Sequence, residues 1–175
     1  MSTIYTIGYE RTDIDRLIRA LLAEDIDLLA DVRAVPISRK RGFSKSALKA
    51  TLEAAGVQYV HFGDLGDPKS GRLAARMGRL EEFRAIHTAH LREANARAAL
   101  GRLAEVATRN VTCLLCFERD PTVCHRTIIA GRLAHRGFTK LDLCPDLIPP
   151  HDRLAAKLPG LHSRQGIATT EQEAR

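Results

Sequence analysis

The sequence predicts a single α/β domain of three-layer, Rossmann-like type, with a mainly parallel sheet of about five strands. Short apolar segments alternate along the chain with segments that carry apolar residues at helical spacing. The apolar segments are nearly continuous in hydrophobic residues, as buried parallel strands are. A length of 175 residues suits one domain with its own core. Alternating strands and helices build βαβ units, so helices should cover both faces of the sheet.

The first part of the chain contains three of these strands and two helices. Thr12 is a plausible N-cap for the first helix, and Ser44 caps the second, which ends at Gly56. We predict strands over 3–7, 27–33 and 57–62 and helices over 13–25 and 44–56.

The second part begins with a long helical stretch rich in Ala and Arg over 80–109, interrupted near Gly101. It continues with strands over 111–117 and 138–143 and a helix over 122–137 between them. The α/β domain is therefore expected over residues 1–145. The proline-broken residues 146–175 are expected to form a C-terminal extension that ends in a flexible tail.

The formal net charge is +6 at pH 7, and it is unevenly distributed. Residues 1–31 hold three Arg and seven acidic residues, a charge of −4, so the remainder carries +10. This asymmetry favours an anionic partner: a nucleotide, a nucleic acid or another phosphorylated substrate. The alternative is that the Arg-rich helices are simply solvated.

Several classes of protein are not favoured by the sequence. No apolar stretch is long enough to span a membrane, and no secretory signal is visible, so we expect a cytoplasmic protein without a membrane partner. The four cysteines suggest thiols rather than a disulfide framework. No G-x-G-x-x-G loop is present, which makes oxidoreduction with a dinucleotide a poor fit. The sequence identifies neither a cofactor nor an oligomeric state.

Ligands of open parallel sheets bind beyond the carboxyl ends of the strands. At these ends, the predicted strands place several polar and reactive residues together at one edge of the sheet. They are Gly8, Tyr9, Glu10, Asp31, Arg33, His61, Cys116 and Glu118.

The segment "LLCFERDPTVCHRTIIAGRL" (114–133) leads from a strand into a helix. Asp120 and Pro121 form a strong helix start, so Cys124 and His125 should lie in or just past the first turn. The helix dipole there favours the thiolate of Cys124 over its thiol. The alternative is that Cys124 is a buried core contact.

Charged residues flank this turn. Glu118 is a candidate general acid or base, or it could hold His125 or Arg126 by a charge-assisted bond. Arg126 is a candidate anion clamp beside the helix N-terminus. The alternative is a buried Glu118–Arg126 pair that only fixes the turn.

Two further cysteine motifs do not indicate a functional site. Cys113 and Cys116 have C-x-x-C spacing, but on a strand their side chains should point to opposite faces. No second ligand pair occurs at zinc-finger spacing, so no metal site is predicted. Cys113 and Arg119 also match C-x5-R, but Cys113 falls inside the strand, where a phosphate loop cannot begin.

A basic segment, "RAVPISRKRGFSKSALK" (33–49), leaves the carboxyl end of the second strand and contains no acidic residue. With Phe43, its cations suit contacts to phosphate groups and a stacked base. The alternative is a solvated loop without a specific role. Its candidate binding residues are Arg33, Arg39, Lys40, Arg41 and Lys45.

Three histidines are further candidates for the site. His61 is a possible proton carrier, but a lone histidine at a strand end is more often structural. His87 and His90 lie three apart in the helical stretch, without a carboxylate at matching spacing, and are assigned to the helix surface.

Together these segments resemble the bacterial and archaeal family known as domain of unknown function 488. The resemblance covers about residues 3–143 and is most specific in the C-F-E-x-D-P-x-x-C-H-R run. Two departures stand out: Tyr9-Glu10 replaces the His-Ser of the family's T-I-G-H-S, and Asp67 replaces the second Gly of L-G-G. The resemblance implies a compact α/β domain with its characteristic residues at one sheet edge, and it implies no settled reaction.

Our leading hypothesis is an enzyme, a hydrolase or group transferase, that acts on a nucleotide, nucleic acid or other phosphorylated substrate. Glu118 would be the acid or base, with Cys124 or His125 assisting. A second hypothesis is a nucleic-acid-binding or regulatory module without turnover. A third is a thiol redox sensor that uses Cys116 and Cys124.

Overall fold

The computed structural model describes residues 2–145, and these form one α/β domain. Its five-stranded sheet is parallel throughout, in the order β3-β2-β4-β1-β5, which confirms the predicted fold class. The predicted extension over 146–175 lies outside the described residues. The strands are β1 (Ser2–Gly8), β2 (Leu28–Asp31), β3 (Gln58–His61), β4 (Thr112–Cys116) and β5 (Phe138–Leu143).

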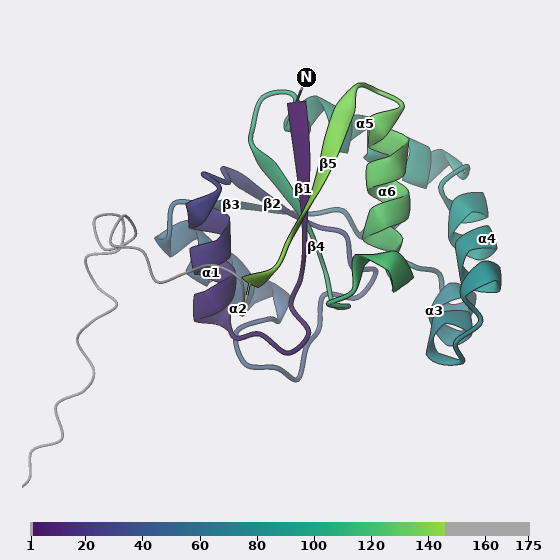
Figure 1. Ribbon diagram of the computed structural model, residues 1–175, viewed down its shortest axis with the longest axis horizontal. Helices are drawn as coiled ribbons and strands as arrows, with labels where there is room; N and C mark the ends of the chain where they lie inside the picture. The colour runs from purple at the N-terminus through teal and green to yellow at the C-terminus, as the bar shows by residue number, and fades with distance from the viewer. Residues whose placement is uncertain (1, 146–175) are drawn as a thin grey trace, which may run out of the picture.

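Helices cover both faces of the sheet (Figure 1). One face carries α1 (Ile14–Ala23) and α2 (Lys45–Ala54). The other carries α5 (Ala94–Ala107) and α6 (His125–Ala134), with α3 (Lys69–Arg76) and α4 (Leu80–His90) packed further out. Two 3₁₀ turns, η1 (Gly63–Leu65) and η2 (Pro121–Val123), precede α3 and α6. No helix among residues 2–145 is both long and apolar enough to cross a membrane.

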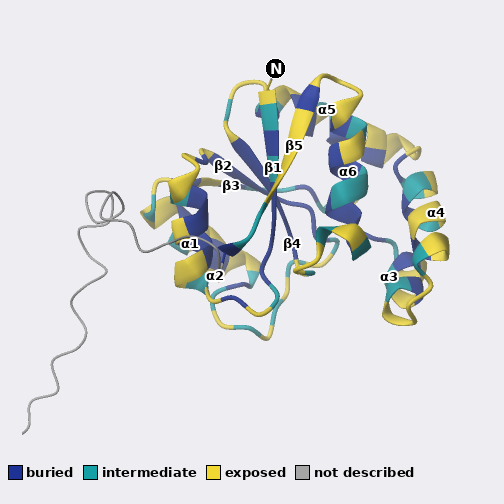
Figure 2. Ribbon diagram, viewed as in Figure 1, coloured by how far each residue is buried: buried dark blue, intermediate teal, exposed yellow. Residues whose placement is uncertain are grey.

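The strands divide the core into two layers because successive side chains of a strand point to opposite faces. On β4, Leu114 packs with α5 and α6, whereas Cys113 and Leu115 pack with α1 and α2. Strands β2 and β4 are buried throughout, whereas Figure 2 shows β5 largely exposed at the sheet edge. The prediction that Cys113 and Cys116 face opposite sides is confirmed, since Cys116 contacts His125 of α6.

Several predicted boundaries were wrong. Asp13, not Thr12, caps α1, because its Oδ1 accepts a hydrogen bond from the backbone N–H of Arg16. The long helix breaks between His90 and Ala94 rather than near Gly101, and α3 was not predicted. The helix expected over 122–137 is divided into η2 and α6.

A buried ion pair joins the carboxyl end of β2 to its surroundings. Arg33 donates from Nε to Asp31 Oδ1 at 2.8 Å and from Nη2 to Asp31 Oδ2 at 2.6 Å. Its Nη1 donates to the hydroxyl of Tyr9 at 3.0 Å and to the carbonyl of Phe43 at 2.9 Å. The hydroxyl of Tyr59 donates to Asp31 Oδ2 at 2.6 Å. These bonds fix the strand ends of β1 and β3 and the basic loop relative to β2.

Gly8, at the end of β1, lies directly against the chain that leaves β4. A Cβ atom at this position would lie 1.9 Å from the carbonyl oxygen of Glu118. Gly66 has a similar role, since its Cβ would lie 2.0 Å from the backbone nitrogen of Ala34. Only glycine permits these close backbone approaches, which bring the segments after β1, β2, β3 and β4 together.

Arg33→Met should destabilise the domain by about 3–5 kcal/mol, because it leaves the buried carboxylate of Asp31 without its partner. The free energy of unfolding is measured by urea denaturation. The exposed Arg41→Met is the control and should change it by no more than about 0.5 kcal/mol. Equal small effects of both changes would contradict the structural role of Arg33.

Gly8→Ala should cost about 1–3 kcal/mol of stability, because the added methyl group must push the Glu118 backbone away from β1. Gly101→Ala is the matched control: the site lies inside α5, and an added Cβ would have no atom within 4 Å. This change should stabilise the protein by about 0.5–1 kcal/mol. Thermal or urea unfolding should show a lower stability for Gly8→Ala and a higher stability for Gly101→Ala than for the wild type.

Candidate functional site

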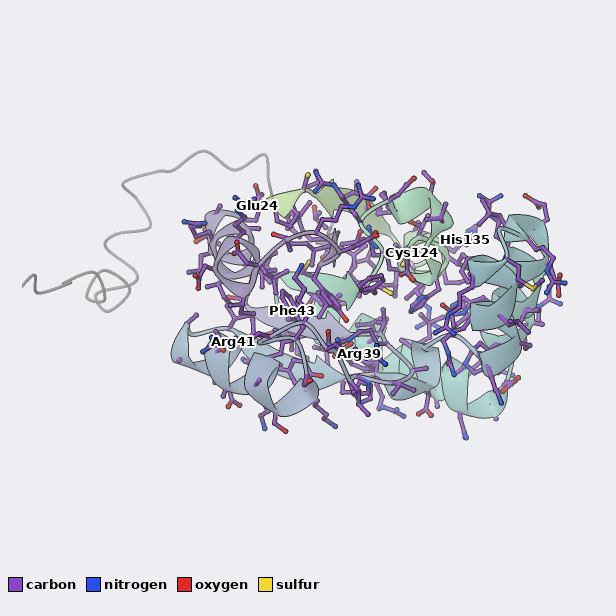
Figure 3. All side chains as sticks on the ribbon, turned by 90° about the horizontal axis from the view of Figure 1, so that it is seen from below. Glu24, Arg39, Arg41, Phe43, Cys124 and His135 are labelled. Atoms are coloured by element: carbon purple, nitrogen blue, oxygen red, sulfur yellow. The ribbon has the colours of Figure 1, made fainter. Side chains whose placement is uncertain are left out.

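The candidate site lies at the carboxyl edge of the sheet, seen from below in Figure 3. Asp120 begins η2 by accepting the backbone N–H of Thr122 on its Oδ1 at 2.8 Å, and Pro121 occupies the first position. The short turn ends at Cys124, which is the N-cap of α6. Because η2 turns the chain before α6 begins, Cys124 and His125 return to the end of β4.

Four side chains meet there, and we call them the thiol cluster: Cys116, Glu118, Cys124 and His125. Their nearest ligand-type atoms all lie within 4.8 Å of one another. Both thiols donate to the same oxygen, Glu118 Oε2, from Cys116 at 3.0 Å and from Cys124 at 3.1 Å. The Nδ1 atom of His125 lies 3.5 Å from the Cys116 sulfur and 3.9 Å from the Cys124 sulfur. The two cysteines and His125 are buried, and Glu118 is half-buried.

A carboxylate from the segment after β3 adjoins the thiol cluster. Asp67 Oδ2 lies 2.7 Å from His125 Nδ1, and Asp67 Oδ1 lies 2.8 Å from Nδ1 of His87 on α4. The second of these contacts does not have the geometry of a hydrogen bond. On the other side of the ring, His125 Nε2 is 2.9 Å from the carbonyl of Val32. His125 therefore links β2, the segment after β3 and α6.

The two thiols of the cluster are not activated. Burial raises the pKa of both Cys116 and Cys124 above the usual range of a thiol. At Cys124, desolvation of the buried sulfur opposes the thiolate that the helix dipole is expected to favour. In the protein as described, both cysteines act as neutral hydrogen-bond donors to Glu118.

Asp67 and His125 shift each other's pKa. Burial alone would raise the pKa of Asp67, but its close contacts with His125 and His87 lower it below the usual range. Burial alone would lower the pKa of His125; the charge of ionised Cys124 and the bond to Asp67 raise it well above the usual range. The pKa of His87 is lowered, mainly by burial.

Arg126 holds the turn together from inside. It is 1% exposed and donates from Nε to the hydroxyl of Thr6 at 3.1 Å. Its Nη1 donates to the carbonyl of Glu118 and its Nη2 to the carbonyl of Arg119 at 3.0 Å. Arg126 thus binds the backbone of Glu118 rather than its carboxylate, and these bonds occupy the guanidinium expected to clamp an anion.

Four other predicted binding residues also make internal contacts. Arg33 and Asp31 are joined in the buried network described above, with Tyr9 as a partner. His61 is half-buried, and its Nε2 lies 2.8 Å from the carbonyl of Arg33. These contacts assign structural roles to residues that sequence reasoning placed next to a substrate.

The basic loop remains the most accessible part of the predicted site. Arg39, Arg41 and Lys45 are exposed, whereas Lys40 is half-buried and donates to the carbonyl of Tyr9 at 3.4 Å. Phe43 is fully buried and stacks on Tyr9 at a centroid distance of 4.4 Å, so it cannot stack on a base. In Figure 3, Arg39 lies between Phe43 and Cys124 on this edge of the molecule.

Ser44 fixes this loop instead of capping α2 with its side chain. Its hydroxyl donates to the carbonyl of Ser38 at 3.0 Å, and no side-chain cap is formed. These bonds tie the end of the loop to its middle, through Ser44 and Ser38, and to its start, through Arg33 and the Phe43 carbonyl.

Sequence reasoning missed Asp67 and His87. The assignment of His87 to the helix surface was wrong, since it is fully buried, and its ring lies 5.2 Å from the ring of His125. Asp67 carried a signal, because it follows a predicted strand at the same sheet edge. His87 carried none, because its position depends on how α4 packs against α6.

One hollow also lies at this edge, beside the ends of β1 and β5. Its volume is about 450 Å³, and neither Glu118 nor His125 lines it. The residues around it include Glu10, Arg11, Arg119, Asp142 and Cys144.

Comparison with known proteins gave one match. The family model described as "Domain of unknown function DUF488" matches residues 13–133. Searches of curated proteins and of solved structures found no match. The matched region runs from the cap of α1 to the last turn of α6 and includes Asp67, His87 and all four residues of the thiol cluster. The chain therefore belongs to the DUF488 family of domains of unknown function.

Proposed function

We propose that the protein is an enzyme, a hydrolase or group transferase, that acts on a nucleotide, a nucleic acid or another phosphorylated substrate. The observation that carries the proposal is the half-buried carboxylate of Glu118, held by two thiols beside the buried Asp67–His125 pair. Strongly coupled titratable groups in partly buried positions are typical of catalytic sites. The carboxyl edge of a parallel sheet is also where such proteins bind ligands.

Glu118 is the candidate general acid or base. The two thiols bond only to Oε2 among the contacts of the described residues, so Oε1 is the oxygen that can exchange a proton with a substrate. His125, whose Nδ1 lies 2.7 Å from Asp67 Oδ2, packs against the thiols that hold the carboxylate. Cys124 orients Glu118, and its raised pKa does not favour a nucleophilic role.

The exposed cations of the basic loop are the candidate anion-binding groups. The loop follows Val32, whose carbonyl contacts His125, and so begins beside the thiol cluster. The sequence assigned anion binding to these cations together with Arg33 and Arg126. Because Arg33 and Arg126 are buried, we assign it to Arg39, Arg41 and Lys45 alone. Exposed cations suit a phosphate group, because it can reach them without displacing buried structure.

Two other hypotheses remain. A binding module without turnover would use the same cations, but its function would not depend on Glu118. The redox sensor is less favoured, because buried thiols with raised pKa values form little thiolate, and the thiolate is the reactive form.

Glu118→Gln should reduce turnover by about 10²–10⁴-fold while binding of the anion is retained, because the amide keeps the shape but cannot transfer a proton. Hydrolysis of chromogenic phosphate monoesters and diesters and of nucleotides is measured as a panel, alongside binding of a fluorescent oligonucleotide. If the oligonucleotide binds but neither the wild type nor the variant turns over any panel member, the binding module replaces the enzyme.

Reversing the charge of Arg39, Arg41 and Lys45 to Glu should weaken oligonucleotide binding by at least about tenfold and lower its salt dependence. The control reverses Arg109, Arg132 and Arg136, which lie at or just beyond the ends of α5 and α6, at the opposite sheet edge. Both triple variants change the net charge equally. Equal weakening by the two would show that overall charge, rather than this loop, attracts the anion.

A further inference from the structure

We propose that Cys116, Glu118, Cys124 and His125 bind one divalent transition-metal ion of the zinc type. Each residue presents one ligand atom, and the four atoms lie within 4.8 Å of one another. Two sulfurs, one imidazole nitrogen and one carboxylate oxygen form a donor set that zinc accepts in four-coordinate sites. The sequence did not reveal this set, because its Cys-x-x-C pair points to opposite faces and the four residues lie at the end of β4, just after β4 and at the start of α6.

The sulfur-to-nitrogen distances are close to those of a tetrahedral site. Typical Zn–S and Zn–N bonds place a sulfur and a nitrogen ligand about 3.5 Å apart in a tetrahedron. The two sulfurs lie 3.5 Å and 3.9 Å from His125 Nδ1. The sulfur-to-oxygen distances of 3.0 Å and 3.1 Å are shorter, because in the described protein the thiols donate hydrogen bonds to Glu118. An ion would replace these two protons and move the oxygen outward by about 0.5 Å.

The surroundings of His125 orient it as a ligand. Its Nε2 lies 2.9 Å from the carbonyl of Val32, which can only accept a hydrogen bond, so Nε2 carries a proton. Nδ1 is then the nitrogen left to bind an ion, and a backbone carbonyl behind the opposite nitrogen is a usual outer contact of a metal-bound histidine. The Cys116 sulfur lies 3.5 Å from Nδ1 and 3.8 Å from Nε2, so the ring would have to turn for Nδ1 to point toward an ion between the sulfurs.

Asp67 and His87 provide the second, independent observation. An ion bound at His125 Nδ1 would leave no proton there for Asp67 Oδ2, which lies 2.7 Å away, to accept. His87 is fully buried beside Asp67, and neither of its ring nitrogens has a hydrogen-bond partner among the described residues. Asp67 Oδ1 is likewise unpartnered, 2.8 Å from His87 Nδ1. A small rotation of Asp67 toward His87 would give both groups a hydrogen bond. His87 could therefore replace His125 as the donor to Asp67 once an ion is bound.

The donor set also selects the kind of ion. Magnesium and calcium prefer oxygen ligands, and this cluster offers one carboxylate and two sulfurs. Thiolate and imidazole ligands instead favour zinc and related ions. Any catalytic use of the ion, such as polarising a phosphoryl oxygen, rests on the proposed function; the binding itself does not.

The test uses the untagged full chain, produced in zinc-supplemented medium and desalted, with metal content measured by inductively coupled plasma mass spectrometry. We expect about one zinc per chain, and less than about a tenth of that in Cys116→Ser and in Cys124→Ser. Cys113→Ala is the matched control: Cys113 is also buried on β4 but faces the opposite layer, and this variant should keep its zinc. Wild-type protein without zinc, or equal loss in all three variants, would overturn the proposal.

A second measurement guards against variants that fail to fold. Co²⁺ is added to metal-free wild-type protein and to the serine variants after circular dichroism has confirmed that they are folded. Wild-type protein should develop the absorption of thiolate-bound tetrahedral Co²⁺, and each folded serine variant should lose part of it. A spectrum without thiolate-to-cobalt charge transfer would contradict the site.

These results separate the two proposals. Stoichiometric zinc without turnover of any panel substrate would sustain the site and remove the enzyme. Turnover that depends on Glu118 in protein that binds neither zinc nor cobalt would sustain the enzyme and remove the metal site.

Discussion

The hydrogen bonds of Arg126 are the constraint on which the rest of the site depends. A fully buried guanidinium must satisfy its donors inside the protein, and Arg126 does so on Thr6 of β1 and on the carbonyls that follow β4. These bonds tie the start of α6 to two strand ends at once. Together with the packing of Gly8 against the Glu118 backbone, the Arg126 hydrogen bonds fix where the thiols and His125 lie.

The site is assembled from segments that are distant in sequence and adjacent at the sheet edge. Glu118 follows β4, Asp67 follows β3 and His87 comes from α4, and each reaches the N-terminus of α6 through a direct contact. The buried Asp31–Arg33 pair has a parallel role beneath the basic loop, on the α1 and α2 side of the sheet. Two buried arginines, Arg33 and Arg126, thus fix the segments that surround the site. The groups that a ligand can reach are Glu118 and the exposed cations of the basic loop.

Much of the fold could be predicted because periodicity and apolar runs report local structure. The order of strands and helices, the shared sheet edge and the opposite orientations of Cys113 and Cys116 all followed from such patterns. The roles of Arg33 and Arg126 did not, since sequence shows a charge but not whether its donors are already occupied. His87 was assigned to the surface because its burial depends on the packing of α4 against α6, which no local pattern reports.

The central claim is that Cys116, Glu118, Cys124 and His125 act as one site rather than as four separate packing residues. X-ray absorption at the zinc edge of zinc-loaded protein tests it most directly, because the spectrum reports the number and kind of atoms bound to the ion. The account predicts two sulfur ligands at about 2.3 Å and two nitrogen or oxygen ligands at about 2.0–2.2 Å. A shell of oxygen and nitrogen alone, typical of an ion bound loosely at the surface, would contradict it.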